Sequence, residues 1–424
     1  MKIKNCCLCG SRELHHFETI FNSGPANNLE NEPNSVKVHS LFPLGLSQCL
    51  NCDHIQLTCP VDASSLFSTY NYKSSLSSSF RSHFDDLASS LISQASVINS
   101  KDLKVLDIGS NDGYLLDCFK RLGWLTYGVE PASNLAEETS CNHSIIQGYF
   151  GSQVITELKK VGKFSLITAN NVFAHTRDLI DFAEIVCDVL EDDGLFVFEV
   201  QYLVDMIENM YFDMIYHEHT SYHHASPLVN TLPKMGLYVS KIEHIETHGG
   251  SIRVYCRRKL QDVDPIVEDS VSYYSNAESK YLGASLTKTI TTFCEDISRK
   301  LAEITEFIDK FISDGYEIWG YTAPAKATTL LSGIGKEQLS FVMGIIDDSI
   351  LKQGKYIPGT DIGIYKEDLL SLAIKNAEQQ ARKVVVIIFA WNIADSIANT
   401  IAQKPYASSN TKFVKLLPIP SELC

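Results

Sequence analysis

Short apolar runs alternate with helical patterns through the middle of the chain. The runs are KVLDIG (104–109), LTYGVEP (125–131), FSLITAN (164–170) and LFVFEV (195–200), and LIDFAEIVCDVL (179–190) carries apolar residues at helical spacing. Apolar runs of this length, separated by helices, are typical of parallel strands that are buried on both faces. The rhythm predicts a doubly wound α/β sheet over about 103–258.

The flanking segments have different patterns. LYVSKIEHIE (237–246) and SIRVYCRR (251–258) alternate apolar and polar residues, which predicts an antiparallel hairpin joined by the turn 247–250. A helical stretch over about 280–313 then leads into a second α/β rhythm, whereas the first 68 residues contain few periodic stretches. We therefore expect three domains, over 1–68, 69–262 and 263–424.

Charge and composition narrow the class of protein. The 424 residues are 45% hydrophobic and carry a formal net charge of −15, so the molecule as a whole repels a phosphate backbone and nucleic acid is not an expected partner. No apolar run approaches the roughly 18 residues of a membrane span, and the N-terminus lacks a signal peptide's apolar region. We expect a cytoplasmic protein without membrane contact, and no obligate protein partner is evident.

Four cysteines near the N-terminus have the spacing of a metal site. Cys6 and Cys9 form one C-x-x-C pair, and Cys49 and Cys52 form another. Paired thiolates of this kind are typical of tetrahedral zinc, and four sulfur ligands leave no open position for a substrate. The pattern predicts a structural zinc ion that stabilises the N-terminal domain. Four buried free cysteines, or a catalytic zinc, are the alternatives.

The turn after the first central strand predicts a cofactor site. KVLDIGSNDGYLLDCF indicates a strand, a turn and a helix, and the turn contains Gly109, Asn111, Asp112 and Gly113. It is not the G-x-G-x-x-G of a dinucleotide site. The sulfonium and amino group of S-adenosylmethionine (SAM) favour nearby acidic residues, and Asp107 and Asp112 satisfy that requirement. SAM is therefore the predicted cofactor.

Two further strand ends complete the predicted cofactor site. Glu130, followed by Pro131, ends the second strand, where a carboxylate can accept hydrogen bonds from a ribose diol. Asn170, Asn171 and Val172 follow the fourth strand at the same sheet edge. A carboxylate at this position serves NAD equally well, so an NAD-binding domain remains an alternative.

The run Tyr216-His217-Glu218-His219 concentrates groups that transfer protons. Histidine has an ordinary pKa near neutral pH, so His217 or His219 is a candidate general base. With His223 and His224, the same histidines are also compatible with a metal site or a polar surface loop. His248 precedes two glycines that permit close backbone approach, which makes it a candidate substrate contact.

The C-terminal α/β segment contains a candidate phosphate site. GYTAPAKATTLL predicts a strand that turns into a helix, and a lysine provides a compact charge for phosphate. We select Lys326, Lys352 and Tyr356 as candidates to hold a nucleotide diphosphate, with solvated surface positions as the alternative. The loop 347–360 is expected to close this site.

The motifs together resemble a known family. DIGSNDGYLL, GVEP, NNVFAH, YHEHTSYH, THGGSIR, GYTAPAKATTLL and IIDDSILKQGKYIPGT occur in this order in the sugar C-methyltransferases of branched-deoxysugar biosynthesis. The resemblance covers nearly the whole chain. It implies a zinc-binding N-terminal region, a class I SAM methyltransferase domain and a C-terminal Rossmann-like α/β domain. The family pattern commonly has glycine where this chain has Thr322 and Ala327.

The resemblance also implies a reaction and the residues that perform it. The implied substrate is a nucleotide sugar, a thymidine diphosphate (TDP) linked 4-keto-6-deoxy sugar, methylated at carbon 3. His219 is implied as the base, with Tyr216, Glu218, His175 and Tyr72 beside it in the active site. A sugar O-methyltransferase, an NAD-dependent oxidoreductase and a non-enzymatic zinc scaffold are the alternatives.

Overall fold

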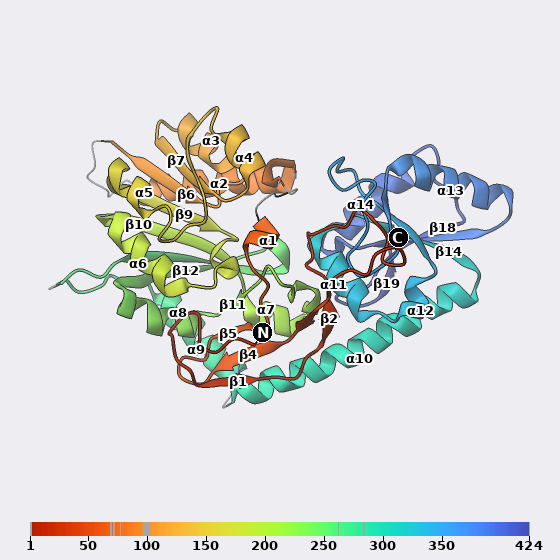
Figure 1. Cartoon of the computed structure of the whole chain (residues 1–424), viewed down its shortest axis with the longest axis horizontal. Helices are drawn as coiled ribbons and strands as arrows, with labels where there is room; N and C mark the ends of the chain where they lie inside the picture. Colours follow the sequence, from red (N-terminus) through yellow and green to blue (C-terminus); the bar gives the residue numbers. More distant parts are fainter. Residues whose placement is uncertain are drawn as a thin grey trace.

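The computed structural model describes residues 2–67, 70, 73–76, 78–95, 102–261, 263–282 and 285–423. Figure 1 shows two α/β layers side by side, the central domain and the C-terminal domain, with N-terminal strands below and between them. One apolar core runs through all three parts and joins residues such as Leu46, Phe198 and Ile308. The described helices include none that is both long and apolar enough to cross a membrane.

The central domain is built on a seven-stranded sheet with the order β12-β13-β10-β9-β6-β7-β8. Only β13 runs antiparallel to its neighbours, β10 and β12. The strands are β6 (Lys104–Ile108), β7 (Leu125–Glu130), β8 (Ser144–Gln147), β9 (Phe164–Asn170), β10 (Leu190–Gln201), β12 (Leu237–Ile245) and β13 (Ser251–Arg258). This arrangement confirms the predicted doubly wound sheet of a class I SAM methyltransferase and the predicted hairpin at its edge.

Helices cover both faces of this sheet because the strands are apolar on both sides. In β9, for example, every residue from Phe164 to Ala169 is buried. The helices are α2 (Ser78–Ala95), α3 (Tyr114–Arg121), α4 (Ser133–Thr139), α5 (Ile155–Val161), α6 (Leu179–Val189), α7 (Leu203–Glu208), α8 (Ala225–Thr231) and α9 (Asp269–Tyr281). Parallel strands end at one sheet edge, so the turns after β6, β7, β9 and β10 meet there.

The N-terminal segment has no large core of its own. Its sheet, in the order β1-β4-β5-β11, takes its last strand from the central domain. The strands are β1 (Leu14–His16), β4 (Leu46–Cys49), β5 (Ile55–Leu57) and β11 (Ser221–Tyr222), beside a separate pair, β2 (Phe21–Ser23) and β3 (Phe42–Leu44). A short helix, α1 (Ser64–Phe67), leads toward the central domain.

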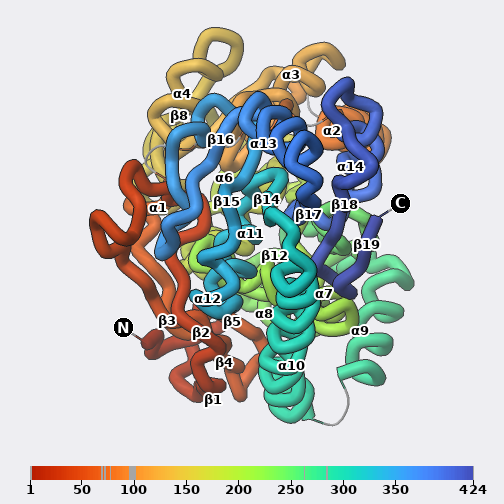
Figure 2. Tube along the Cα trace, turned by 90° about the vertical axis from the view of Figure 1, so that its right-hand side faces the viewer, coloured from red at the N-terminus to blue at the C-terminus, as the bar shows by residue number. Residues whose placement is uncertain are grey.

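A long helix connects the two α/β domains. α10 (Leu286–Ser313) begins at Ser285, whose side chain accepts a hydrogen bond from the Lys288 N–H. Its 28 residues extend about 42 Å, and Figures 1 and 2 show it running along the molecule from the N-terminal strands to the C-terminal domain. A stripe of apolar residues at helical spacing, including Ile290, Phe293 and Ile297, is buried along it.

The C-terminal domain is a second α/β layer with the strand order β16-β15-β14-β17-β18-β19. All its strand pairs are parallel except the last. The strands are β14 (Tyr316–Tyr321), β15 (Val342–Ile346), β16 (Ile364–Tyr365), β17 (Lys383–Ile388), β18 (Thr411–Lys415) and β19 (Ser421–Leu423). The helices are α11 (Ala325–Gly333), α12 (Lys336–Leu339), α13 (Glu367–Gln379) and α14 (Ala394–Ala402). The second α/β rhythm predicted from the sequence is thus present.

Candidate active site

A cavity of about 740 Å³ lies where the three parts of the chain meet. Its walls come from the carboxyl edge of the central sheet, from the N-terminal segment and from the turn before α11. Most of the residues predicted for the site line it: Asp107, Gly109, Asn111, Glu130, Pro131, Asn170, Asn171, Val172, His175, Tyr216, Glu218, His219, His248, Lys326 and Lys352. Asp112, Gly113 and Tyr356 are not among the lining residues, and Tyr72 lies outside the described residues.

The turn after β6 approaches the turn after β9 closely. Gly109 has a φ of +68°, and a Cβ built on it would lie 2.5 Å from a Val172 methyl group. Only glycine fits both the backbone conformation and the space. Asn111 follows with a φ of +50°, and its side-chain oxygen accepts a hydrogen bond from the Ser74 N–H. The turn is therefore a rigid floor of the cavity.

Glu130 is held by two backbone donors. Its Oε2 accepts from the Asn111 N–H at 2.8 Å, and its Oε1 accepts from the Ala132 N–H at 2.9 Å. Burial raises the pKa of Glu130, and the two N–H groups lower it. Each carboxylate oxygen retains a lone pair, so this side chain can accept the hydroxyl groups of a ribose.

Asp107 and Asn170 also offer hydrogen-bonding groups at this end of the cavity. Asp107 accepts a hydrogen bond from the Thr168 hydroxyl at 2.7 Å, and burial raises its pKa to about 7. Both polar atoms of the Asn170 amide are buried without a partner among the described residues. Buried amide groups are normally paired, so Asn170 is available to a ligand. These groups fit the predicted SAM site.

Asp112 and Gly113 belong to the same turn but lie outside the cavity lining. Asp112 accepts hydrogen bonds from the Ser74 hydroxyl at 3.0 Å and from the Ser75 N–H at 3.1 Å. Gly113 precedes α3 with a φ of +78°. Direct contact of these two residues with a cofactor stays a prediction.

His219 is oriented by two hydrogen bonds. Its Nδ1 lies 2.8 Å from the Met214 carbonyl oxygen, and its Nε2 lies 2.8 Å from the Tyr216 hydroxyl. A carbonyl oxygen only accepts, so Nδ1 carries the proton, and the Nε2 lone pair accepts a hydrogen bond from the Tyr216 hydroxyl. Burial lowers the pKa of His219 to about 4. The imidazole is therefore neutral near pH 7 and able to accept a proton.

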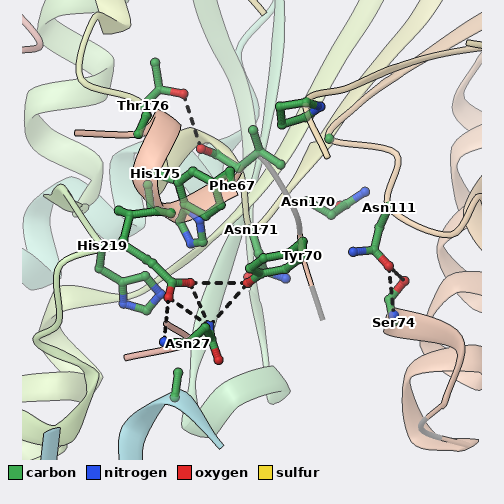
Figure 3. A pocket seen from close by; sticks show the side chains of 18 of the residues that line it. Asn27, Phe67, Tyr70, Ser74, Asn111, Asn170, Asn171, His175, Thr176 and His219 are labelled. Atoms are coloured by element: carbon green, nitrogen blue, oxygen red, sulfur yellow. Dashed lines mark hydrogen bonds between the residues drawn. The ribbon is translucent and has the colours of Figure 1, made fainter. Parts of the chain in front are cut away.

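His175 lies beside His219 on the cavity wall, at the end of the short helix that follows β9. Its ring stacks on Phe67 at 5.6 Å and lies 5.1 Å from the ring of His219 (Figure 3). Burial holds the pKa of His175 well below its usual range. A neutral His175 has one N–H group, with which it can donate a hydrogen bond to a ligand in the cavity.

Glu218 is bound by the N-terminal segment. The Asn27 amide nitrogen lies 2.9 and 2.8 Å from the two carboxylate oxygens, and the Asn27 backbone N–H donates at 3.2 Å. The Tyr70 hydroxyl donates to Oε2 at 3.2 Å (Figure 3). Burial raises the pKa of Glu218 to about 7, and the hydrogen bonds from Asn27 and Tyr70 lower it. Sequence reasoning missed Asn27 and Tyr70, although Tyr70 belongs to the YNYKSS run that supplied Tyr72.

The neighbouring histidines do not form a surface loop. His217, His223 and His224 are all buried, and His224 lies 3.2 Å from Glu278 and 3.1 Å from the Asp53 carbonyl oxygen. Among the described residues, the four N-terminal cysteines are the only group of three or more ligating side chains close enough to share an ion. The surface-loop alternative is therefore wrong, and the histidines lack the geometry of a metal site.

The candidate substrate residues His248, Lys326 and Lys352 also line the cavity. His248 has a φ of +58° in the turn between β12 and β13, and its ring lies 5.0 Å from that of Phe80. The Lys326 amine lies 4.0 Å from the centre of the Trp391 ring. Lys352 donates to the Ala323 carbonyl at 2.9 Å and lies 3.2 Å from Asp347.

Tyr356 occupies a different position from the two lysines. Its backbone exchanges hydrogen bonds with Glu30 of the N-terminal segment. The loop 347–360 is thus tied to the N-terminal segment at Tyr356, and contact of this side chain with a substrate stays a prediction.

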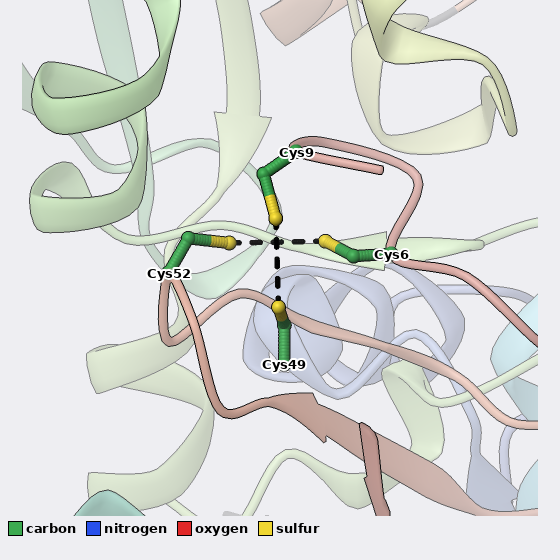
Figure 4. Close-up of side chains that lie close together, drawn as sticks. All are labelled: Cys6, Cys9, Cys49 and Cys52. Carbon is green, nitrogen blue, oxygen red and sulfur yellow. Dashed lines mark hydrogen bonds between the residues drawn. The ribbon is translucent and has the colours of Figure 1, made fainter. Parts of the chain in front are cut away.

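The four cysteines converge at one point (Figure 4). Cys6 and Cys52 have their sulfur atoms 3.7 Å apart, those of Cys9 and Cys49 are 3.5 Å apart, and all four lie within 4.8 Å of one another. Four thiolates bound to one zinc ion at about 2.3 Å would lie about 3.8 Å apart. The cluster is consistent with a structural zinc site.

Comparisons with known proteins agree with this geometry. The family model described as "C-methyltransferase C-terminal domain" matches residues 246–420, and that described as "Methyltransferase domain" matches residues 80–242. C-methyltransferase NovU from Streptomyces niveus is 30% identical over 426 residues, which cover 99% of this chain and 96% of that protein.

Two solved structures resemble part of the chain at low identity. The magnesium protoporphyrin IX methyltransferase of Synechocystis PCC 6803 with bound SAM is 12% identical over 42% of this chain and 79% of its own, with a TM-score of 0.32. A SAM-dependent methyltransferase from Clostridium acetobutylicum ATCC 824 is 14% identical over 42% of this chain and 92% of its own, with a TM-score of 0.35. Neither likeness bears on the substrate.

The full-length match decides among the alternatives that the sequence left open. Carbon is the methylated atom rather than oxygen, and the chemistry is methyl transfer rather than NAD-dependent hydride transfer. The chain belongs to the sugar C-methyltransferase family and is a SAM-dependent C-methyltransferase.

Proposed function

We propose that this enzyme methylates carbon 3 of a TDP-linked 4-keto-6-deoxy sugar. The proposal rests above all on His219, which lines a cavity shared by the central and C-terminal domains and donates its Nδ1 proton to the Met214 carbonyl, so that Nε2 is its basic nitrogen. A neutral imidazole in that position is suited to remove the acidic proton beside a ketone. The family relationship makes a sugar the expected carrier of that ketone.

The cofactor is expected at the β6 and β7 end of the cavity. Glu130 would hold the ribose diol, with Pro131 beside it, and the Gly109 turn, Asn111, Asn170, Asn171 and Val172 would surround the rest. SAM, when bound, supplies an electrophilic methyl group. The enzyme's contribution is to hold the sugar carbon in line with that methyl group.

The sugar nucleotide is expected on the opposite side. Lys326 and Lys352, with Tyr356 nearby, would hold the diphosphate, and His248 would contact the sugar. His219 would take the proton from carbon 3, leaving an enolate whose oxygen requires hydrogen-bond donors. Tyr216, His175 and Tyr72 are the candidate donors, and Glu218 would fix the local hydrogen bonds. The proton then passes from His219 to solvent after methyl transfer.

We propose that the cysteine cluster holds a structural zinc ion. Its four sulfur atoms leave no open coordination position, and it lies in the turns beside the N-terminal sheet rather than in the cavity lining.

The substrate is tested by the products. The zinc-replete enzyme would be incubated with SAM and a panel of nucleotide-linked 4-keto sugars, and each product mass-analysed. We expect one added methyl group on carbon 3 of the TDP-linked 4-keto-6-deoxy sugar. Methylation of a different sugar carbon would refute the assigned position, and turnover only with another nucleotide would refute the assigned carrier.

The base is tested separately. His219→Asn should lower turnover by about 10²- to 10⁴-fold while leaving SAM affinity nearly unchanged. In deuterium oxide without SAM, the wild type should exchange the carbon 3 hydrogen and the variant should not. Exchange at the wild-type rate in the variant would remove His219 as the base.

A further inference from the structure

Trp391 is a buried residue of the C-terminal domain that contacts three elements of the active site. It follows β17, and its indole N–H donates to the Asp213 carboxylate at 2.7 Å. The indole ring stacks on Tyr211 with the ring centres 4.2 Å apart and the planes 21° apart. The Lys326 amine lies over the same ring at 4.0 Å. Trp391 itself does not line the cavity.

The turn that carries His248 is packed against this ring as well. A Cβ built on Gly249 would lie 2.6 Å from Trp391 and 3.0 Å from Tyr211. The position therefore admits only glycine without displacement of the indole. Because His248 is the preceding residue, the place of its side chain depends on the place of Trp391.

Asp213 connects Trp391 to the base. It lies in the short helix Phe212–Met214, and the next residue supplies the carbonyl that orients His219. Asp213 is 1% exposed, and its Oδ1 has no hydrogen-bond partner among the described residues. The indole N–H is therefore the side-chain contact that fixes this carboxylate, and with it the Met214 carbonyl.

The charges in this cluster support the same role. Burial raises the pKa of Asp213 to about 6 and lowers that of Lys326 to about 8, and the attraction between the two groups opposes both shifts. Both groups are thus mainly charged at neutral pH. The carboxylate and the ammonium share Trp391 as a common neighbour, which links the substrate side of the cavity to the base.

We propose that Trp391 is a positioning residue for methyl transfer: it holds the Met214 carbonyl, the Lys326 side chain and the His248 turn in one arrangement. The inference rests on the proposed role of His219 as the base. The C-terminal domain thereby contributes to proton removal as well as to substrate binding.

The test compares two tryptophans of the same domain. Trp391→Phe keeps a ring for stacking and for Lys326 but removes the donor to Asp213. Trp319→Phe is the matched control, because Trp319 is equally buried, donates to Glu317 at 2.9 Å and lies outside the cavity lining. For both variants we would measure kcat, KM, SAM affinity, Tm and SAM-free deuterium exchange at carbon 3 of a TDP-linked 4-keto-6-deoxy sugar.

We expect Trp391→Phe to lower kcat and the exchange rate roughly tenfold or more, the effect of losing one hydrogen bond to a charged group. SAM affinity should stay near the wild-type value, and Trp319→Phe should keep both rates. Should Trp391→Phe fail to fold, Asp213→Ala serves instead, since it removes the acceptor of the same hydrogen bond and should lower both rates in the same way. If kcat and exchange stay within twofold of the control, Trp391 is only a core residue.

The same series includes His219→Asn, which keeps the two hypotheses separable. Exchange that survives in His219→Asn overturns the assigned base. Exchange that is lost in His219→Asn but retained in Trp391→Phe overturns the positioning role alone.

Discussion

At the scale of single residues, Glu218 and His219 show how adjacent side chains acquire different roles. A carboxylate has about four lone-pair positions, and the Asn27 backbone N–H, the Asn27 amide and the Tyr70 hydroxyl occupy them as donors. Such a carboxylate is poorly placed to accept a substrate proton. His219 donates from Nδ1 to the Met214 carbonyl, and its Nε2 accepts a single hydrogen bond, from the Tyr216 hydroxyl. Under the proposed function, proton removal therefore belongs to His219, and Glu218 organises the wall beside it.

Asn27→Ala tests this division of roles through pH. Burial raises the pKa of Glu218 to about 7, and the Asn27 donors, which favour the ionised form, oppose the rise. If ionised Glu218 is needed, turnover increases as pH rises through this pKa and is lost as pH falls below it. Removing Asn27 raises the pKa further, so we expect the acid limb of the pH–rate profile to move to higher pH. Turnover at pH 7 should fall roughly tenfold.

The neighbouring position provides the control. Asn28 is exposed, so Asn28→Ala should leave the pH–rate profile unchanged. An acid limb at the same pH in Asn27→Ala and the wild type would show that Glu218 ionisation does not govern turnover.

The sequence predicted the local motifs of the site but not the long-range contacts between them. The Gly109 turn, Glu130 and the YHEH run were predicted because each lies within a short local pattern. Asn27 and Tyr70 lie 191 and 148 residues before Glu218, and nothing in their neighbouring residues points to it. Trp391 was missed for a similar reason, since its partner Asp213 lies 178 residues away in another domain.

At the scale of elements, the parallel strands and the β12–β13 hairpin were predictable, whereas the short strands β8 and β11 were not. β6, β9 and β17 are apolar runs because both of their faces are buried. β8 has exposed residues at both ends, and β11 contains only two residues, so neither produces a clear pattern. In α9 only Val271 and Glu278 are buried, which leaves no apolar stripe to detect. β6 and β9, which the sequence does predict, are the strands that end at the two turns of the predicted cofactor site.

Gly109→Ala tests the contact between two such turns. The new Cβ would meet Val172 at 2.5 Å and force apart the turns that follow β6 and β9. We expect SAM affinity, measured by calorimetry, to fall by roughly tenfold or more, with a loss of about 1–3 kcal/mol in unfolding free energy.

Gly123→Ala separates the steric contact from backbone strain. Gly123 also has a positive φ, +86°, but nothing lies within 4 Å of the Cβ position. This control should lose some stability through strain and keep SAM affinity. Equal SAM affinity in the two variants would exclude the Gly109–Val172 contact as a determinant of binding.

At the scale of the whole molecule, the three predicted segments are interlocked rather than independent. β5 of the N-terminal sheet pairs with β11 of the central domain. The Thr328 hydroxyl of α11 donates to the Ala26 carbonyl, next to the Asn27 that binds Glu218. The N-terminal segment therefore contacts the run 216–219 and the C-terminal domain within two consecutive residues. Segment boundaries follow from local composition, whereas this interlocking arises from long-range pairing that composition does not record.

Removal of the proposed zinc ion should reveal this dependence. Without that ion, the four cysteines are no longer joined through one metal and the N-terminal sheet loses folding free energy, so we expect Asn27 to be no longer held against Glu218. Elemental analysis of Cys49→Ser should no longer find stoichiometric zinc, its Tm should fall and its turnover should drop by more than tenfold. Calorimetry should still show SAM binding, because the Gly109 turn and Glu130 belong to the central domain.

Cys141→Ser is the control, because Cys141 is exposed and lies away from the cluster. It should change none of these quantities. Full turnover in zinc-free Cys49→Ser would show that the active site forms without the metal, and simultaneous loss of SAM binding would show that the central domain needs the N-terminal sheet to fold.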